Sequence, residues 1–185
     1  INMYGITETT VHVTYHRISE ADLVNKRSII GRPLDDLSLY ILDEDLQFVP
    51  KGVAGEMYVG GAGLALGYLH RPELTRERFI PAPTSLASQE KLVDIERLYK
   101  TGDIARYVRD EGNTGVIEYL GRADDQVKIR GYRIELGEVE STLTSHHKVN
   151  SSVATVFTGA NGQDHIVAYV DANVDGNGVA DSSVD

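Results

Sequence analysis

Four basic side chains in the segment 121–140 stand among carboxylates and glycines, and they could bring positive charge to a phosphate group. They are Arg122, Lys128, Arg130 and Arg133. Apolar residues on both sides of Arg130 and Gly131 predict a short hairpin that turns there and holds basic residues on a tight loop. A charged surface hairpin without a ligand explains the same pattern, and the residues alone leave both interpretations open.

A second group of polar side chains lies in residues 2–8, which read NMYGITE. The ring of Tyr4, next to Gly5, can stack on a purine, while Thr7 and Glu8 can hold a phosphate and a metal ion. Taken alone, a residue such as Tyr4 is more often a half-buried core residue, and one such as Glu8 is more often solvated. The segment is therefore a candidate nucleotide contact, with a structural alternative.

The triplet Thr101, Gly102 and Asp103 places a carboxylate just after a glycine turn. An aspartate in that position can accept hydrogen bonds from both hydroxyls of a ribose. The alternative is an Asx-type turn that closes a hairpin. The triplet alone favours the turn.

Four glycines follow an expected strand and form a loose dinucleotide fingerprint: Gly60, Gly61, Gly63 and Gly67. That fingerprint requires a long helix next, but Arg71 and Pro72 interrupt within a few residues, and no Gly-Lys-Ser/Thr sequence follows. Glycines that permit tight turns and close backbone packing are the better interpretation. Among the histidines, His12 and His16 could share a helical face, but no nearby carboxylate completes a zinc set, so no histidine metal site is expected.

The elements that must position these residues are mostly strands between about residues 30 and 120. Strands are expected at 37–42, 56–59, 105–108 and 116–120, the last two joined by the turn-rich segment 109–115. A helix is expected near 72–79, with Pro72 in its first turn. The polar segment 85–96 is expected to be a mobile insertion.

After residue 124 the pattern changes, which predicts a domain boundary. The hairpin described above is followed by an expected helix at about 136–146, because Leu136, Val139 and Leu143 recur at helical spacing. Two strands are then expected at 153–157 and 165–170.

The composition is that of an ordinary folded protein, with 41% apolar and 25% charged residues in 185. A net charge of −10 argues against nucleic acid or an anionic membrane as a partner. The chain has no cysteine, which excludes disulfides and thiolate metal sites. No apolar run is long enough to span a bilayer.

The segment 121–140, GRADDQVKIRGYRIELGEVE, resembles the eighth core motif of adenylation domains in nonribosomal peptide synthetases, which activate amino acids with ATP. Three further segments resemble the fifth, sixth and seventh motifs in the same order. They are 2–8 (NMYGITE), 55–79 (GEMYVGGAGLALGYLHRPELTRERF) and 98–103 (LYKTGD). Four motifs in register cover most of residues 1–140.

The resemblance implies an α+β fold in three parts. Residues 1–123 would be the C-terminal part of the large adenylation core, with its β-rich third subdomain from about residue 30. Residues 124–170 would be part of the small α+β C-terminal lid, and 171–185 a polar linker or truncated end. The chain would then be a piece of a larger polypeptide, because the family's glycine-rich phosphate loop and late lysine are not among these residues. A cytoplasmic location also follows from the family.

The resemblance assigns roles to individual residues. Nucleotide contacts would come from Asn2, Tyr4, Gly5, Asp103, Tyr119 and Arg122. Within that set Tyr4 would stack on adenine, Asn2 would hold the adenine edge, and Asp103 would anchor the ribose.

The remaining assignments concern catalysis and movement. Thr7 would contact the phosphate or the substrate carboxylate, and Glu8 would ligate Mg²⁺. Lys128 would be a basic residue on the lid's moving hairpin and is counted with Thr7 and Glu8 as catalytic. Asp124 would be the hinge about which the lid rotates.

Met3, Val11 and His12 match positions that line the amino-acid pocket, and together they resemble part of the pattern in threonine-activating domains. An imidazole there could hydrogen-bond a β-hydroxyl. The resemblance therefore implies that ATP and Mg²⁺ are used to convert an amino acid, with threonine expected, to an aminoacyl-AMP. The acyl group would then pass to the phosphopantetheine thiol of a carrier domain.

The partners implied are the carrier and condensation domains of the same synthetase and a small MbtH-like activator protein. Three alternatives stay open. The chain could belong to a free-standing acyl- or aryl-CoA ligase, or to a non-catalytic domain kept as a scaffold. The polar end could also lead into an inserted tailoring domain.

Overall fold

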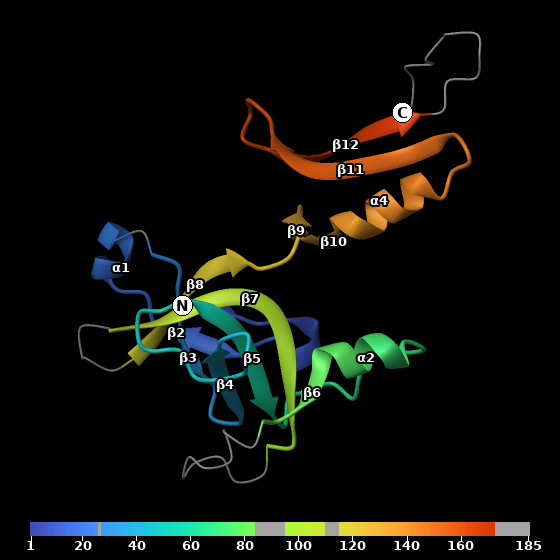
Figure 1. Cartoon of the computed structure of the whole chain (residues 1–185). Helices are drawn as coiled ribbons and strands as arrows, with labels where there is room; N and C mark the ends of the chain where they lie inside the picture. The colour runs from blue at the N-terminus through green and yellow to red at the C-terminus, as the bar shows by residue number, and fades with distance from the viewer. Residues whose placement is uncertain (26, 84–94, 110–114, 173–185) are drawn as a thin grey trace. The chain divides into compact units, whose positions relative to one another are not determined.

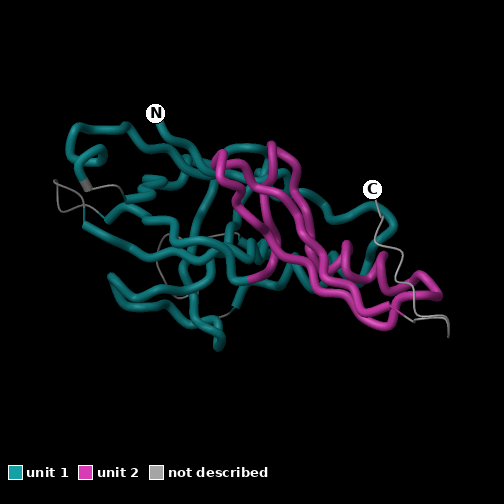
Figure 2. Tube along the Cα trace, turned by 90° about the horizontal axis from the view of Figure 1, so that it is seen from above, with its two compact units in different colours: residues 1–123 teal, residues 124–185 magenta. Residues whose placement is uncertain are grey.

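The structure is a computed structural model that describes residues 1–25, 27–83, 95–109 and 115–172 (Figure 1). Internal contacts divide the chain into two compact units, residues 1–123 and 124–185 (Figure 2). The division falls between Ala123 and Asp124. This is the place where the sequence pattern changes from strands and turns to hairpin, helix and strands. Each unit is described by itself.

The first unit is built on one eight-stranded sheet in which every pairing is antiparallel. Along the sheet the order is β1-β2-β3-β8-β7-β5-β4, and β6 pairs with β7 outside this path. The strands are β1 (Asn2–Tyr4), β2 (Thr14–His16), β3 (Ile29–Pro33), β4 (Leu37–Leu42), β5 (Gly55–Gly61), β6 (Phe79–Pro81), β7 (Arg97–Arg109) and β8 (Gly115–Arg122). This order places β7 and β8, which are far from β1 in sequence, within the same sheet.

Among the described residues of this unit, short helices between the strands are the 3-10 helix η1 (Thr7–Thr9), α1 (Glu20–Asn25) and α2 (Pro72–Arg78). Pro72 lies in the first turn of α2, where its missing N–H costs no hydrogen bond. The expected helix near 72–79 is therefore confirmed.

Both faces of β4 are buried, because alternate side chains of a strand point to opposite faces. Leu37, Leu39 and Ile41 belong to one core cluster together with Met57 and Val59 of β5 and Ile117 of β8. Tyr40 and Leu42 belong to a second cluster together with Tyr58 and Leu98. Side chains on both faces of β4 therefore pack in the core of this unit.

The second unit begins with the hairpin of β9 (Gln126–Ile129) and β10 (Tyr132–Glu135). Arg130 and Gly131 form its two-residue turn, and both have positive φ, 52° and 85°. That combination is typical of a type I′ turn, in which glycine carries no steric cost. The hairpin predicted from the sequence is confirmed.

Helix α4 (Leu136–Thr144) follows the hairpin and packs on β11 (Val149–Thr158), which pairs with β12 (Asp164–Ala172). The carboxylate of Glu140 accepts a hydrogen bond from the amide of Ala154, and its carbonyl oxygen accepts one from Ser152. These bonds fasten the helix to the strand. The predicted helix and both strands are confirmed, with the helix ending two residues earlier and both strands longer than expected.

The expected α+β class and the strands between residues 30 and 120 are confirmed, but two local expectations are wrong. The short strands β1 and β2 lie ahead of the β-rich region and were not expected. His12 and His16 share no helix, because Thr14–His16 is strand β2 and His12 lies in the loop before it. Asp171 and Ala172, expected to begin a polar linker, end β12 instead.

Some expectations fall outside the described residues. They are most of the polar segment 85–96, most of the turn 109–115 and all but the first two residues of the segment 171–185. Among the described residues, no helix has the length and apolar character needed to cross a membrane.

Candidate functional site

Asp103 lies inside the long strand β7, which corrects the expectation of a turn after Gly102. Gly102 has a φ of 76°, and the pairing with β5 shifts register between Glu56 and Tyr58 at this level. The strand therefore bulges here, as a glycine with positive φ permits. The bulge is held by two hydrogen bonds. Thr101 Oγ1 accepts from the amide of Asp103 at 3.0 Å, and Glu56 Oε1 accepts from the amide of Gly102 at 3.1 Å.

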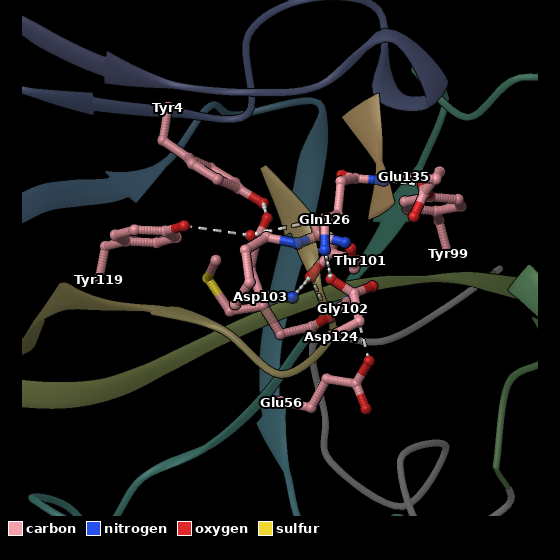
Figure 3. A network of polar contacts seen from close by, with 12 residues as sticks. Tyr4, Glu56, Tyr99, Thr101, Gly102, Asp103, Tyr119, Asp124, Gln126 and Glu135 are labelled. Carbon is pink, nitrogen blue, oxygen red and sulfur yellow. Dashed lines mark hydrogen bonds and ion pairs between the residues drawn. The ribbon is translucent and has the colours of Figure 1, made fainter. Parts of the chain in front are cut away.

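The carboxylate of Asp103 is almost fully buried, with 3% of the residue exposed, and polar side chains from β1 and β8 surround it (Figure 3). The hydroxyl of Tyr4 donates to Oδ2. On the other oxygen, Oδ1, the hydroxyl of Tyr119 donates at 3.4 Å and Nη1 of Arg122 at 3.2 Å. Three residues up to 118 positions apart in sequence, from Tyr4 to Arg122, thus meet at the carboxylate of Asp103.

Strand pairing accounts for this meeting. Asp103 and Arg122 are direct partners in the antiparallel pairing of β7 with β8. Arg122 also donates to the carbonyl oxygen of Thr101 at 3.0 Å, so its guanidinium is fixed on two acceptors. An opposite charge and several donors are what a carboxylate requires when it is removed from water.

The two tyrosines form an aromatic pair next to this carboxylate. Their ring centroids lie 6.1 Å apart, with an angle of 34° between the planes. Burial is the main cause that raises the pKa of Tyr4 far above its usual value, and the negative charge of Asp103 adds to it. Tyr4 therefore stays a hydrogen-bond donor over the whole working pH range.

This arrangement fits a nucleoside. An aromatic surface stands beside a carboxylate that can accept from ribose hydroxyls, and a guanidinium next to it can contact ribose or phosphate. The hydroxyls of Tyr4 and Tyr119 donate to the same oxygens that a ribose would use. A ribose at this carboxylate would therefore compete with these internal hydrogen bonds.

Glu8 forms a second buried carboxylate in the first unit, on helix η1 and with 6% exposure. The hydroxyl of Tyr68 donates to its Oε1 at 2.7 Å and lies 3.1 Å from the hydroxyl of Tyr99. Burial, followed by the hydrogen bond to Glu8, raises the pKa of Tyr68 above its usual value. The neighbouring Thr7 is exposed.

The donor set at Glu8 fits Mg²⁺ in one particular mode. In the described part of the chain, no three His, Cys, Asp or Glu side chains are grouped closely enough to hold a metal by themselves. Mg²⁺ commonly binds through only one or two carboxylates, with water and substrate phosphates completing its octahedron. A single carboxylate such as Glu8 is sufficient for that mode.

The other residues expected near the nucleotide or amino acid lie around β1. The side-chain amide of Asn2 donates to the carbonyl oxygen of Ile29 at 2.7 Å, so it ties β1 to β3. Met3, Val11 and His12 are exposed. A Cβ on Gly5 would stand 1.8 Å from the carbonyl oxygen of Val11, so only glycine lets the loop with Val11 and His12 pack against this position.

Two predicted residues belong to the second unit. Asp124 accepts a hydrogen bond from the amide of Gln126 at 3.3 Å, in the manner of an Asx turn. Lys128 is exposed on β9 and pairs across the hairpin with Arg133 of β10. The hinge and catalytic roles expected for these two residues stay predictions.

Sequence reasoning missed Thr101, Tyr68 and Tyr99 as members of these two clusters. Thr101 carried a usable signal, because a hydroxyl residue two positions before an aspartate can bond the local backbone. Tyr68 and Tyr99 carried none, since their contacts with each other and with Glu8 depend on how distant strands and loops are arranged. The packing interpretation of Gly67 is supported, because a Cβ there would meet the side chain of Thr75 at 2.4 Å.

Comparisons with known proteins show which family the chain resembles. Residues 1–69 match the model of the AMP-binding enzyme family. A dimodular nonribosomal peptide synthase of Bacillus subtilis (strain 168) is 50% identical over 171 residues, which are 92% of this chain and 7% of that protein.

Two solved structures are also similar. PA1221, a nonribosomal peptide synthetase protein containing adenylation and PCP domains, is 31% identical with a TM-score of 0.74, over 91% of this chain and 32% of that one. The four-domain synthetase AB3403, solved with AMP and glycine, is 43% identical with a TM-score of 0.54, over 91% of this chain and 12% of that one. The chain belongs to the AMP-binding enzymes, within the adenylation domains of nonribosomal peptide synthetases, and it spans only a small part of these relatives.

Proposed function

We propose that this chain supplies the ribose-binding and metal-binding part of a domain that adenylates an amino acid. In the proposed reaction an oxygen of the amino-acid carboxylate attacks the α-phosphorus of ATP. A bond forms between that oxygen and the α-phosphorus. The bond between the α-phosphorus and the oxygen that bridges it to the β-phosphorus breaks, and its electron pair leaves with pyrophosphate. The observation that carries the proposal is the convergence of Tyr4, Tyr119 and Arg122 on the buried carboxylate of Asp103.

In this proposal the chain's own residues act by positioning and electrostatics. Asp103 accepts the ribose hydroxyls in place of Tyr4 and Tyr119, whose rings then border the base, with Asn2 and Gly5 at its edge. Arg122 remains fixed on Thr101 and directs positive charge toward the ribose and phosphate. No side chain of this cluster needs to transfer a proton during the step.

Glu8 is the proposed carboxylate ligand of Mg²⁺, and the exposed Thr7 beside it would contact the phosphate or the substrate carboxylate. When bound, Mg²⁺ would neutralise charge on the phosphates. Lys128 is proposed to bring a further positive charge to the reaction, and Asp124 to be the hinge that allows it to move.

Threonine is the proposed amino acid. Met3 at the start of the chain and Val11 and His12 in the loop packed against Gly5 are the proposed pocket residues. The imidazole of His12 would hydrogen-bond the β-hydroxyl of threonine, and such a site rejects analogues that lack the hydroxyl.

In the second half of the proposed cycle the acyl group passes to a phosphopantetheine thiol on a carrier domain. Support comes from PA1221, whose structure contains adenylation and PCP domains. Condensation domains and a small MbtH-like activator protein are further proposed partners, and a cytoplasmic location is proposed with them.

Amino-acid-dependent exchange of pyrophosphate into ATP tests the proposal. It is measured with the full-length polypeptide that carries these residues, with each of the twenty standard amino acids, and with and without an activator protein. Exchange that is greatest with threonine supports the whole proposal, whereas exchange with another amino acid contradicts the role of His12 only. Activity that requires free CoA would indicate an acyl- or aryl-CoA ligase. ATP binding without any exchange would indicate a scaffold domain.

A further inference from the structure

We infer that Tyr68 is a positioning residue that holds the carboxylate of Glu8 in the orientation needed to bind Mg²⁺. The inference rests on the proposed function, because it takes Glu8 as the metal ligand. It assigns a role to a residue of the glycine-rich segment 60–68, which the sequence explained only as a packing feature.

The contact between the two residues is direct and buried. The hydroxyl of Tyr68 donates to Oε1 of Glu8 at 2.7 Å, across 60 positions of sequence. The same segment also reaches the backbone of Glu8, because the amide of Ala65 donates to the carbonyl oxygen of Glu8 at 2.9 Å. Glu8 is therefore held by its side chain and by its main chain from one and the same loop.

Tyr68 is itself fixed by the start of helix α2. Its amide donates to Thr75 Oγ1 at 2.9 Å, and that hydroxyl donates to the carbonyl oxygen of Arg71 at 2.9 Å. Gly67, with a φ of 150°, allows the chain to approach Thr75 this closely. These contacts set the position of the Tyr68 backbone before any ligand is considered.

The ring of Tyr68 is fixed as well. It packs edge-on against Phe79, with centroids 5.7 Å apart, and Phe79 packs on Tyr99 at 4.9 Å. The hydroxyls of Tyr68 and Tyr99 lie 3.1 Å apart. This aromatic cluster leaves the Tyr68 hydroxyl little freedom except to point at Glu8.

Such a partner matters more for Mg²⁺ than for most ligands. Mg²⁺ requires near-ideal octahedral geometry, so a carboxylate that rotates freely binds it less well. Hydrogen-bond partners of metal ligands fix that orientation, and their loss lowers metal affinity by about 10- to 100-fold. Tyr68 stands in this relation to Glu8.

Tyr68→Phe in the full-length polypeptide removes only the hydroxyl. The dissociation constant of ATP is measured by calorimetry in the presence of Mg²⁺ and in EDTA. The value in EDTA divided by the value with Mg²⁺ is the factor by which the metal tightens ATP binding. We expect that ratio to fall about 10-fold in Tyr68→Phe, with ATP binding in EDTA unchanged. Tyr107→Phe is the matched control. It also removes a tyrosine hydroxyl in the first unit, but that hydroxyl donates to the carbonyl oxygen of Leu39 and not to Glu8.

A double-mutant cycle shows whether Tyr68 acts through Glu8. Glu8→Gln should lower the same ratio, and adding Tyr68→Phe to it should produce no further loss. If Tyr68→Phe keeps the wild-type ratio while Glu8→Gln loses it, the inference is wrong and the proposed function stands. If Tyr68→Phe weakens ATP binding equally with and without Mg²⁺, the role of Tyr68 is purely structural, and this result would also overturn the inference. A wild-type protein that does not bind ATP would overturn the proposed function together with the inference.

Discussion

Two hairpins of this protein carry cross-strand charge pairs of opposite character. In the β7–β8 hairpin Asp103 faces Arg122, and the pair is largely buried. In the β9–β10 hairpin Lys128 faces Arg133, and both residues are exposed. Opposite charges across a strand pair stabilise it, whereas like charges directly opposite destabilise it.

The difference indicates two kinds of binding contribution. The first hairpin satisfies its own charges and offers a rigid, preorganised carboxylate. The second places a lysine directly opposite an arginine on an exposed hairpin, which concentrates positive charge there. In the proposed function these correspond to a fixed ribose site and to a charge delivered to the phosphates.

The largest effect is expected from Asp103→Ala, which removes the central acceptor and leaves Arg122 without its charge partner. We expect pyrophosphate exchange to fall at least about 100-fold, as for the loss of one preorganised electrostatic group. The control is Asp45→Ala, an exposed aspartate in a turn of the same unit. Equal activity in the two variants would contradict the role of Asp103.

The next effect is expected from Arg122→Lys, which keeps the charge but loses the planar guanidinium whose Nη1 donates to both Asp103 and the carbonyl oxygen of Thr101. We expect the KM for ATP to rise about 10-fold. Arg106→Lys is a matched control, because Arg106 forms the same type of cross-strand pair with Glu118 at 2.8 Å in the same hairpin. A similar rise in both variants would mean that the hairpin's stability, and not the site, is responsible.

Lys128→Glu separates stability from activity in the second hairpin. It converts a like-charge pair into an opposite-charge pair, so we expect the free energy of unfolding of this unit to rise by about 0.2–1 kcal/mol. The exchange rate should nevertheless fall about 10-fold, because a positive charge is lost. Thermal unfolding and exchange are measured together, with Lys148→Glu as an exposed control in the same unit. An unchanged exchange rate would remove Lys128 from the mechanism.

The smallest effect is expected from Tyr119→Phe. Its hydroxyl lies 3.4 Å from Asp103, at the long end of hydrogen-bond distances, and a ribose would replace it. We expect the KM for ATP to change by no more than about 3-fold, which corresponds to less than a typical hydrogen bond. A loss comparable to that of Asp103→Ala would show that the hydroxyl itself takes part in binding.

Local features of the fold were predictable because they depend on neighbouring residues. The hairpin turn at Arg130 and Gly131, the start of α2 at Pro72 and the helix beginning at Leu136 all follow from turn chemistry, proline geometry and helical spacing. The three-residue strands β1 and β2 are too short to show a period. For the same reason His12 and His16 could be taken for a helical pair.

The site was predictable in its members but not in its contacts. Tyr4, Asp103, Tyr119 and Arg122 were identified by motif resemblance, whereas the hydrogen bond between Tyr4 and Asp103 joins residues 99 positions apart. The triplet Thr101, Gly102 and Asp103 predicted a turn at Gly102, where the structure has a bulge. Only the pairing of β7 with β5 decides between a turn and a bulge. Likewise, the partner of Glu8 is set by a loop 60 positions away.

The most direct test of the central claim compares ATP with 2′,3′-dideoxy-ATP, which lacks the ribose hydroxyls. Their dissociation constants are measured with the wild-type polypeptide and with Asp103→Asn. We expect the wild-type protein to bind ATP at least about 10-fold more tightly than the analogue, and the variant to bind both with nearly the same affinity. Equal preference for ATP in the two proteins would contradict the assignment of Asp103 to the ribose.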